Sequence, residues 1–228
     1  MRKIIGITGG VGSGKSTVLN SLEKEYGAKI LMADKIGHEV FEKNTDTYKK
    51  ITEHFGKEIL DDQERIDHIK LAAIIFKNET EKEYLNKIIH PYVLDRIKDE
   101  INKWKNETGI NQQENIKNEA KHKTENRKTK NESINKTINL LVIETALMFE
   151  TGCDKLCDEV WGVITDTEIR IERLMRDRGY SKEKAKSIID TQLSDEELKE
   201  RCKEIITNNS LISDTEKSIN KLISKLLM

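Results

Sequence analysis

One short segment near the start of the chain limits its fold more than any other. The apolar, β-branched run Lys3–Thr8 (KIIGIT) is typical of a strand buried on both faces of a parallel sheet. The sequence GGVGSGKST follows directly, and a helical pattern then begins with Val18, Leu19 and Leu22 on one face. The order strand, glycine loop, helix predicts that the chain opens with one unit of an α/β fold.

The spacing inside this loop predicts its ligand. Gly9, Gly14, Lys15 and Ser16 form the phosphate-binding pattern G-x4-G-K-S. Glycines let backbone N–H groups approach phosphate oxygens without a Cβ in the way, and the following helix adds the positive end of its dipole. A lysine here can span the β- and γ-phosphates, and the Ser16 hydroxyl can ligate magnesium. We therefore expect a nucleoside triphosphate at this loop.

Further apolar runs extend the sheet. They are Ala28–Met32, Leu140–Ile143, Glu159–Ile164 and the short patch EIITNN that starts at Glu204. Helical patterns separate them, and the last of these carries Ile219, Leu222, Ile223 and Leu226 at helical spacing. This alternation predicts a single α/β domain over residues 1–228, a P-loop NTPase-type parallel sheet of about five strands flanked by helices.

Two helical regions differ from the predicted sheet layer. From about Thr45 to Trp104 the pattern is helical throughout. The chain's one proline, Pro91, indicates a helix that starts or bends there. A charged helical stretch from Thr167 to about Asp190 is expected to form a lid over residues 166–192.

Residues 105–138 have a different character. They contain seven asparagines and thirteen charged residues but five apolar ones, without a periodic apolar face. This composition predicts a mobile insertion or a frayed helical extension. A basic binding arm is the alternative, since the net charge of the stretch is +3.

Composition excludes several classes of function. Charged residues make up 36% of the chain, but they nearly cancel to a net charge of −1, which argues against general nucleic-acid binding. The sequence has no apolar run long enough to span a membrane and no signal-peptide cleavage pattern. Its three cysteines (Cys153, Cys157 and Cys202) are an odd number and are expected to be reduced thiols in the cytoplasm, not a metal site.

Two carboxylates at predicted strand ends are candidates for chemistry, because strand ends in parallel sheets face the ligand crevice. Asp34 could orient or deprotonate an acceptor hydroxyl, or it could cap the helix that follows. Glu144 could hold magnesium through water, or it could be a solvated strand end.

A third set of candidates is cationic. Four arginines lie about three residues apart and could clamp a phosphoryl group when a lid closes: Arg170, Arg173, Arg176 and Arg178. The alternative is a solvated helix face that pairs with Glu168, Glu172 and Asp177. His90, just before Pro91, could contact substrate, although a lone histidine is more often structural.

The class of P-loop protein can be narrowed by the guanine-binding motif that the sequence lacks and by the carboxylates and arginines that it contains. A GTPase would normally carry an N-K-x-D motif, and N-K pairs such as those at Asn86, Asn135 and Asn220 lack the aspartate. The carboxylates and arginines instead fit a small-molecule kinase. A nucleoside monophosphate kinase or another metabolite kinase would share these features, and a non-catalytic nucleotide-binding regulator is a further alternative.

Six stretches together resemble one family, dephospho-coenzyme A kinase. In chain order they are IIGITGGVGSGKSTV, ADKIGHEV, LNKIIHPYV, ETALMFETGCDKLCDEVW, RIERLMRDRGYSKEKAKSIIDTQ and EIITNNS. They cover nearly the whole chain except residues 105–138. The glycine loop is shared with many kinases, whereas HPYV between helices and LMFETGCDKL after a strand are far more specific.

The resemblance implies that the chain transfers a phosphoryl group from ATP to the ribose 3′-hydroxyl of dephospho-coenzyme A. We further expect Mg²⁺ at the loop, a cytoplasmic location, and a monomer or small homo-oligomer. Asp34 is then the base or acceptor-orienting residue, and His90 lies near the acceptor pocket. We accordingly expect residues 60–104 to form a helical acceptor-binding region, and Lys15 and Arg173 to neutralise the developing charge. Ser16 holds magnesium, and Glu144 supports it through water. The ATP site comprises Gly10, Val11, Gly12, Ser13, Gly14, Lys15, Ser16 and Thr17.

The chain departs from the family pattern at three places. Met32-Ala33-Asp34 stands where the family often has Asp-Ala-Asp, so only the second carboxylate is present. The family's D-x-P-L-L-F-E is ETALMFE from Glu144 on, with a longer acid and no proline. After RLM the family commonly reads x-R-D-x-x-S, and here the order is R-D-R-G-Y-S from Arg176, which leaves open which arginine meets phosphate.

Overall fold

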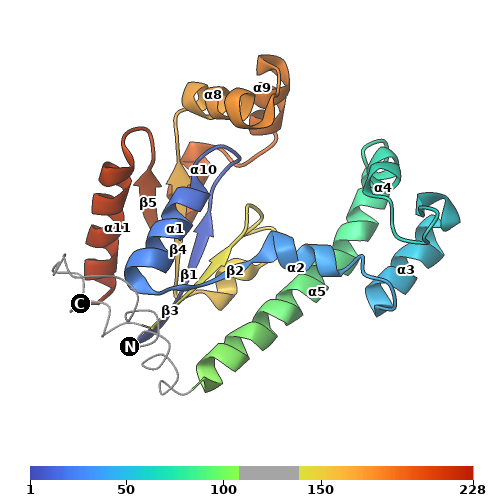
Figure 1. Ribbon diagram of the computed structural model, residues 1–228, viewed down its shortest axis with the longest axis horizontal. Helices are drawn as coiled ribbons and strands as arrows, with labels where there is room; N and C mark the ends of the chain where they lie inside the picture. Colours follow the sequence, from blue (N-terminus) through green and yellow to red (C-terminus); the bar gives the residue numbers. More distant parts are fainter. Residues whose placement is uncertain (108–138, 228) are drawn as a thin grey trace, which may run out of the picture. The chain divides into compact units, whose positions relative to one another are not determined.

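The computed structural model describes residues 1–107 and 139–227 (Figure 1). The chain divides into two compact units, which we treat separately. The larger unit contains Met1–Leu31 and the chain from Ile101 on, and the smaller unit is Met32–Glu100. The predicted insertion at 105–138 lies almost entirely outside the described residues.

The larger unit is built on a five-stranded sheet in the order β2-β3-β1-β4-β5. Its strands are β1 (Arg2–Thr8), β2 (Lys29–Met32), β3 (Asn139–Glu144), β4 (Glu159–Ile164) and β5 (Glu204–Thr207). The pairs β1–β3, β1–β4 and β4–β5 are parallel. The prediction of a parallel α/β sheet of about five strands is confirmed, and each strand lies where an apolar run predicted it.

Burial of both faces explains why β1 reads as a continuous apolar run. Ile5 and Ile7 are buried on one face and Ile4 on the other. In register, Ile5 lies opposite Val142 of β3 and Glu159 of β4, so β1 is the central strand. Because the chain leaves β1 toward β2 and leaves β4 toward β5, the order of the sheet reverses between β1 and β4, where a ligand crevice is expected.

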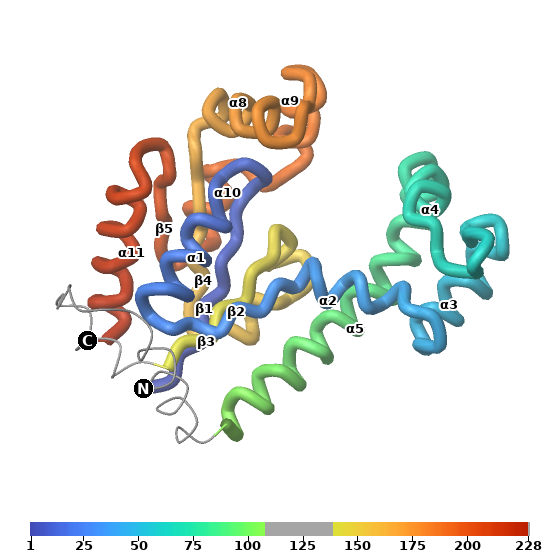
Figure 2. Tube along the Cα trace, viewed as in Figure 1, coloured from blue at the N-terminus to red at the C-terminus, as the bar shows by residue number. Residues whose placement is uncertain are grey.

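Helices α1 (Lys15–Tyr26) and α11 (Ile212–Leu226) cover one face of this sheet (Figures 1 and 2). The side chains buried there include Ile5, Ile7, Val18, Leu22, Trp161, Val163, Ile219, Leu222 and Ile223. On the opposite face Gly6 leaves room for Met148, and Gly162 leaves room for Cys202. The short helices η2 (Cys153–Leu156) and α10 (Asp195–Arg201) belong to this unit.

The predicted charged helical stretch forms two helices, α8 (Thr167–Arg178) and α9 (Lys182–Asp190). Gly179 ends α8 in the left-handed conformation at φ 63°, which a glycine adopts without a Cβ penalty. Ile171, Leu174, Ala185 and Ile189 bury the apolar faces of the two helices against each other. Both helices lie at the end of the sheet from which the loop after β1 projects (Figure 2).

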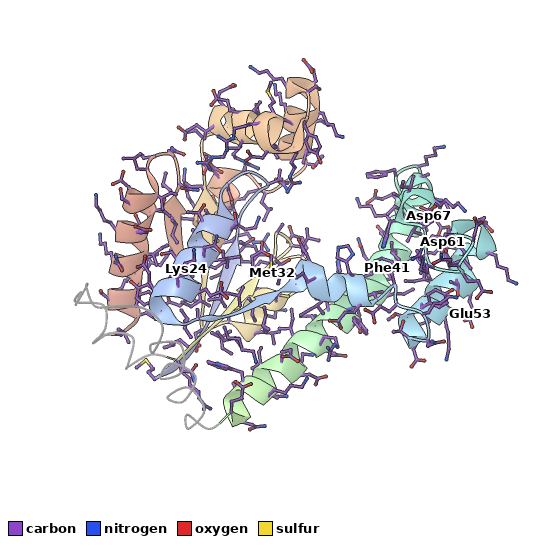
Figure 3. The ribbon with its side chains drawn as sticks, in the orientation of Figure 1. Lys24, Met32, Phe41, Glu53, Asp61 and Asp67 are labelled. Atoms are coloured by element: carbon purple, nitrogen blue, oxygen red, sulfur yellow. The ribbon has the colours of Figure 1, made fainter. Side chains whose placement is uncertain are left out.

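The smaller unit is helical. It contains α2 (Ala33–Glu39), α3 (Asp46–Phe55), η1 (Lys57–Ile59), α4 (His68–Ile75) and most of α5 (Glu79–Asn106). Its core includes Val40, Ile51, Phe55, Ile59, Ile66, Leu71 and Leu85. Phe41, Asp61 and Asp67, labelled in Figure 3, come from the segments that connect these helices.

Of the two alternatives for Pro91, a helix that starts there is wrong, because α5 begins at Glu79 and continues through the proline. An internal proline removes one backbone hydrogen bond and costs about 3 kcal/mol. Apolar residues are buried on both sides of it, Leu85 before and Val93 and Ile97 after. Packing of both halves of α5 therefore outweighs the local cost of the proline.

Among the described residues, no helix is long and apolar enough to cross a membrane.

Candidate active site

The loop between β1 and α1 has the conformation that its glycines predict. Gly14 is the N-cap of α1 at φ 88°, and a Cβ there would lie 1.9 Å from Nδ2 of Asn208. Both the backbone angle and the close approach therefore require glycine. Gly10 lies equally close to its neighbours, since a Cβ added there would lie 2.0 Å from Nη2 of Arg170. The loop is thus held between its own helix and side chains from distant parts of the sequence.

Lys15 and Glu144 meet at the carboxyl end of the central strands. Nζ of Lys15 donates to the carbonyl of Gly9 at 2.8 Å and lies 3.7 Å from Oε1 of Glu144. Glu144 is only 5% exposed, so the alternative of a solvated strand end is wrong. Ser16 is exposed in the first turn of α1, where its hydroxyl is accessible to a ligand.

Helix α8 fastens the tip of this loop through Arg170. Nε of Arg170 donates to the carbonyl of Val11 at 2.9 Å, and Nη2 donates to Oε1 of Gln192 at 2.9 Å. The same Gln192 oxygen accepts the N–H of Val11 at 2.8 Å. The Val11 N–H is therefore bonded to a side chain. Burial lowers the pKa of Arg170, which is 5% exposed.

Arg173 makes a second set of contacts with the loop. Its Nη1 donates to the carbonyl of Gly12 at 3.1 Å, and its Nη2 donates to the carbonyl of Asn208 at 2.9 Å. The Asn208 side chain donates to the carbonyl of Ser13 at 2.9 Å and accepts from the Thr215 hydroxyl at 2.9 Å. These contacts join α8, the loop and the segment after β5.

The four arginines therefore divide into two pairs. Arg170 and Arg173 bind backbone carbonyls of the phosphate-binding loop, which the solvated-face alternative does not predict. Arg176 is exposed and pairs with Asp177 at 2.7 Å, as that alternative predicts. Arg178 is also exposed. The two arginines nearer the start of α8 are thus the ones brought to the loop.

The acceptor-site candidates belong to the smaller unit. Asp34 is exposed in the first turn of α2, two residues after Met32, which Figure 3 labels. The N-cap of α2 is Met32, without a side-chain capping bond, so the alternative that Asp34 caps this helix is wrong. His90 is half-buried within α5, one residue before Pro91.

Sequence reasoning missed three residues that the fold brings to the loop. Besides Gln192 and Asn208, the buried hydroxyl of Thr165 lies within hydrogen-bond distance of the carbonyls of Ser13 (2.9 Å) and Asn208 (3.1 Å). Thr165 and Asn208 each follow a strand directly, β4 and β5, so position at a strand end could have found them. Gln192 follows α9, and no spacing rule points to it.

These features define a class. A phosphate-binding loop leaves the central strand of a five-stranded parallel sheet, with lysine, a buried carboxylate and two arginines around it, so the larger unit is a P-loop nucleotide-binding domain. A model of the family described as dephospho-CoA kinase matches residues 3–113 and 111–214.

Individual relatives agree with this match. A dephospho-CoA kinase of Fusobacterium nucleatum is 35% identical over 218 residues, which cover 96% of this chain and 95% of the relative. One from Bacillus cereus is 32% identical over 225 residues, covering 99% and 98%. The chain therefore belongs to the dephospho-CoA kinase family: it is a kinase that phosphorylates dephospho-CoA to coenzyme A.

Solved structures show the same fold. A dephospho-CoA kinase from Campylobacter jejuni has a TM-score of 0.63 and 25% identity, covering 100% of this chain and 98% of its own. A crystal structure from Thermus thermophilus has a TM-score of 0.73 at 23% identity, covering 99% and 98%, and indicates the fold alone.

Proposed function

We propose that the chain transfers the γ-phosphoryl group of ATP to the 3′-hydroxyl of the ribose of dephospho-CoA, which gives coenzyme A and ADP. The observation that carries the proposal is the phosphate-binding loop itself, with Lys15 beside the buried Glu144, in a chain of this family. In this reaction the 3′-oxygen forms a bond to phosphorus as the bond from phosphorus to the β–γ bridging oxygen of ATP breaks.

The proposed roles follow from charge and access. Asp34 accepts the proton of the 3′-hydroxyl or orients it, since its carboxylate is exposed at the start of α2. Lys15 and Arg173 stabilise the charge that develops on the transferred group and on the leaving oxygen. His90 and the helical region 60–104 bind the acceptor, and residues 166–192 act as the lid.

The donor set near the loop fits magnesium. Ser16 offers an exposed hydroxyl and Glu144 a carboxylate close to Lys15, and Mg²⁺ prefers such hard oxygen ligands together with phosphate oxygens and water. We propose that Ser16 would hold the ion directly and Glu144 through water. A bound Mg²⁺ would neutralise part of the triphosphate charge.

The setting of the reaction is also part of the proposal. The three cysteines are free thiols, which supports a reducing cytoplasmic location. We propose a monomer or a small homo-oligomer, as expected for a kinase whose nucleotide loop and its supporting arginines come from one chain.

An acceptor panel tests the proposed function. ATP consumption is measured with dephospho-CoA, with nucleoside monophosphates and with shikimate, each at the same enzyme concentration. We expect turnover with dephospho-CoA and only background consumption with the others. Faster turnover with a nucleoside monophosphate would identify another metabolite kinase, and ATP binding without phosphorylation of any acceptor would identify a regulator.

A further inference from the structure

The Gln192 side chain contacts both Val11, at the tip of the phosphate-binding loop, and Arg170 of helix α8. It lies just beyond the end of α9, yet its Oε1 accepts both the Val11 N–H at 2.8 Å and Nη2 of Arg170 at 2.9 Å. Arg170 completes the ring by donating Nε to the Val11 carbonyl at 2.9 Å. Both backbone polar groups of Val11 are therefore used by side chains more than 150 residues away in sequence.

The Arg170 guanidinium is unusual for a buried cation, because both of its hydrogen-bond acceptors are neutral. The guanidinium of Arg170 is almost fully buried, and its hydrogen-bond acceptors are an amide oxygen and a backbone carbonyl. Buried cations in proteins are generally paired with carboxylates. Within the described part of the chain, no carboxylate forms an ion pair with Arg170, and Asp195 acts on it only at longer range.

The position of the Arg170 guanidinium indicates why its hydrogen-bond acceptors are neutral. The Arg170 guanidinium lies against Gly10, so closely that a Cβ on Gly10 would meet both its Cζ and the Gln192 oxygen within 3 Å. Gly10 belongs to the loop expected to hold the triphosphate. A carboxylate in place of the Gln192 amide could make the same two hydrogen bonds, but it would cancel the positive charge next to the phosphates.

We propose that Gln192 is a positioning residue for the nucleotide: a neutral bridge that fixes the tip of the phosphate-binding loop and leaves the charge of Arg170 available to the triphosphate of ATP. This inference rests on the proposed function, since it requires ATP at that loop. It assigns Gln192 two separable effects, one on loop geometry through the Val11 bond and one on charge through its neutrality.

Two variants separate these effects. Gln192→Glu keeps both hydrogen bonds and adds one negative charge, whereas Gln192→Met keeps the length but removes the amide acceptor. Asn44→Asp is the matched control, because it makes the same amide-to-carboxylate charge change on an exposed turn of the smaller unit, outside the proposed acceptor-binding region. The readouts are the Kd of ATP measured by calorimetry, the KM of dephospho-CoA, the melting temperature and hydrogen exchange at the Val11 amide.

For Gln192→Glu we expect an ATP Kd about tenfold higher, in line with one charge-assisted interaction. The KM of dephospho-CoA, the melting temperature and Val11 protection should stay near wild type. For Gln192→Met we expect faster exchange at Val11 together with weaker ATP binding. Asn44→Asp should bind both ATP and dephospho-CoA as the wild type does.

The inference is overturned if Gln192→Glu binds ATP as tightly as the wild type. It is also overturned if that variant loses ATP affinity, dephospho-CoA affinity and thermal stability in parallel, because a purely structural role would do that. If Gln192→Glu does not fold, unchanged Val11 exchange and ATP affinity in Gln192→Met would overturn the inference. Because ATP binding is measured at equilibrium, failure of the wild type to phosphorylate dephospho-CoA would refute the proposed function separately.

Discussion

Gly10 offers the sharpest test of how the phosphate-binding loop is built. Gly10→Ala would place a methyl group 2.0 Å from Nη2 and 2.7 Å from Cζ of Arg170. These separations are far below van der Waals contact, so the buried guanidinium must move. Movement breaks its bonds to the Val11 carbonyl and to Gln192.

The expected size of the effect follows from those two bonds. A hydrogen bond to a charged group contributes about 1.5–3 kcal/mol, so losing both costs at least about 3 kcal/mol of unfolding free energy. For a chain of this length, 1 kcal/mol shifts the melting temperature by roughly 2–4 °C. We therefore expect Gly10→Ala to melt about 6–12 °C below the wild type and to bind ATP more weakly.

Thermal unfolding followed by circular dichroism, with ATP titration at 25 °C, measures both effects. Gly37→Ala is the control, because a Cβ at this position of α2 meets only a methyl group of Val93, at 3.9 Å, and alanine is the better helix former. It should melt at or slightly above the wild-type temperature. A Gly10→Ala protein that melts and binds ATP like the wild type would refute the packing argument.

Three further predictions test the site. Arg173→Ala should lower kcat/KM for ATP at least about tenfold, because it removes a positive charge and the hydrogen bonds to the carbonyls of Gly12 and Asn208. Replacing the exposed Arg176 by alanine should change kcat/KM little. Equal effects of the two variants in steady-state kinetics would contradict the assignment of Arg173. Asp34→Asn should reduce kcat by about 10²–10⁴-fold while the Kd of ATP stays nearly unchanged, and Asp46→Asn, in the first turn of α3, should retain full turnover. Cys157 and Cys202 should react at least about 100-fold more slowly than free cysteine with a disulfide reagent at pH 8, because burial raises the pKa of Cys157 to about 12 and that of Cys202 to about 11. Burial also raises the pKa of Cys153, which should react more slowly than free cysteine too, and all three thiols should react rapidly after denaturation; one thiol reacting at the free rate would contradict this prediction.

The strands and the loop could be predicted because their signals are local. A strand buried on both faces needs an uninterrupted apolar run, as in Leu140–Ile143, and the loop needs glycines at fixed spacing. Lys15 and Ser16 follow from that spacing alone. The buried position of Glu144 was open from the sequence, because a strand end can be either solvated or covered, and only the assembled sheet decides.

The supporting contacts could not be predicted for a physical reason. Gln192 and Val11 are 181 residues apart, and their hydrogen bond depends on how α9 ends relative to the loop, which no local pattern records. The same holds for Asn208 and Ser13, 195 residues apart. Pro91 shows the reverse case, since its local signal allowed a helix start, whereas apolar packing on both sides keeps the proline inside α5.

The central claim is that the 3′-hydroxyl of the acceptor ribose receives the γ-phosphoryl group of ATP. The most direct measurement compares ATP consumption with dephospho-CoA, with its 3′-deoxy analogue and with its 2′-deoxy analogue. We predict turnover with dephospho-CoA and the 2′-deoxy analogue, and only background hydrolysis with the 3′-deoxy analogue. Phosphorylation of the 3′-deoxy analogue at a rate similar to that of dephospho-CoA would contradict the claim.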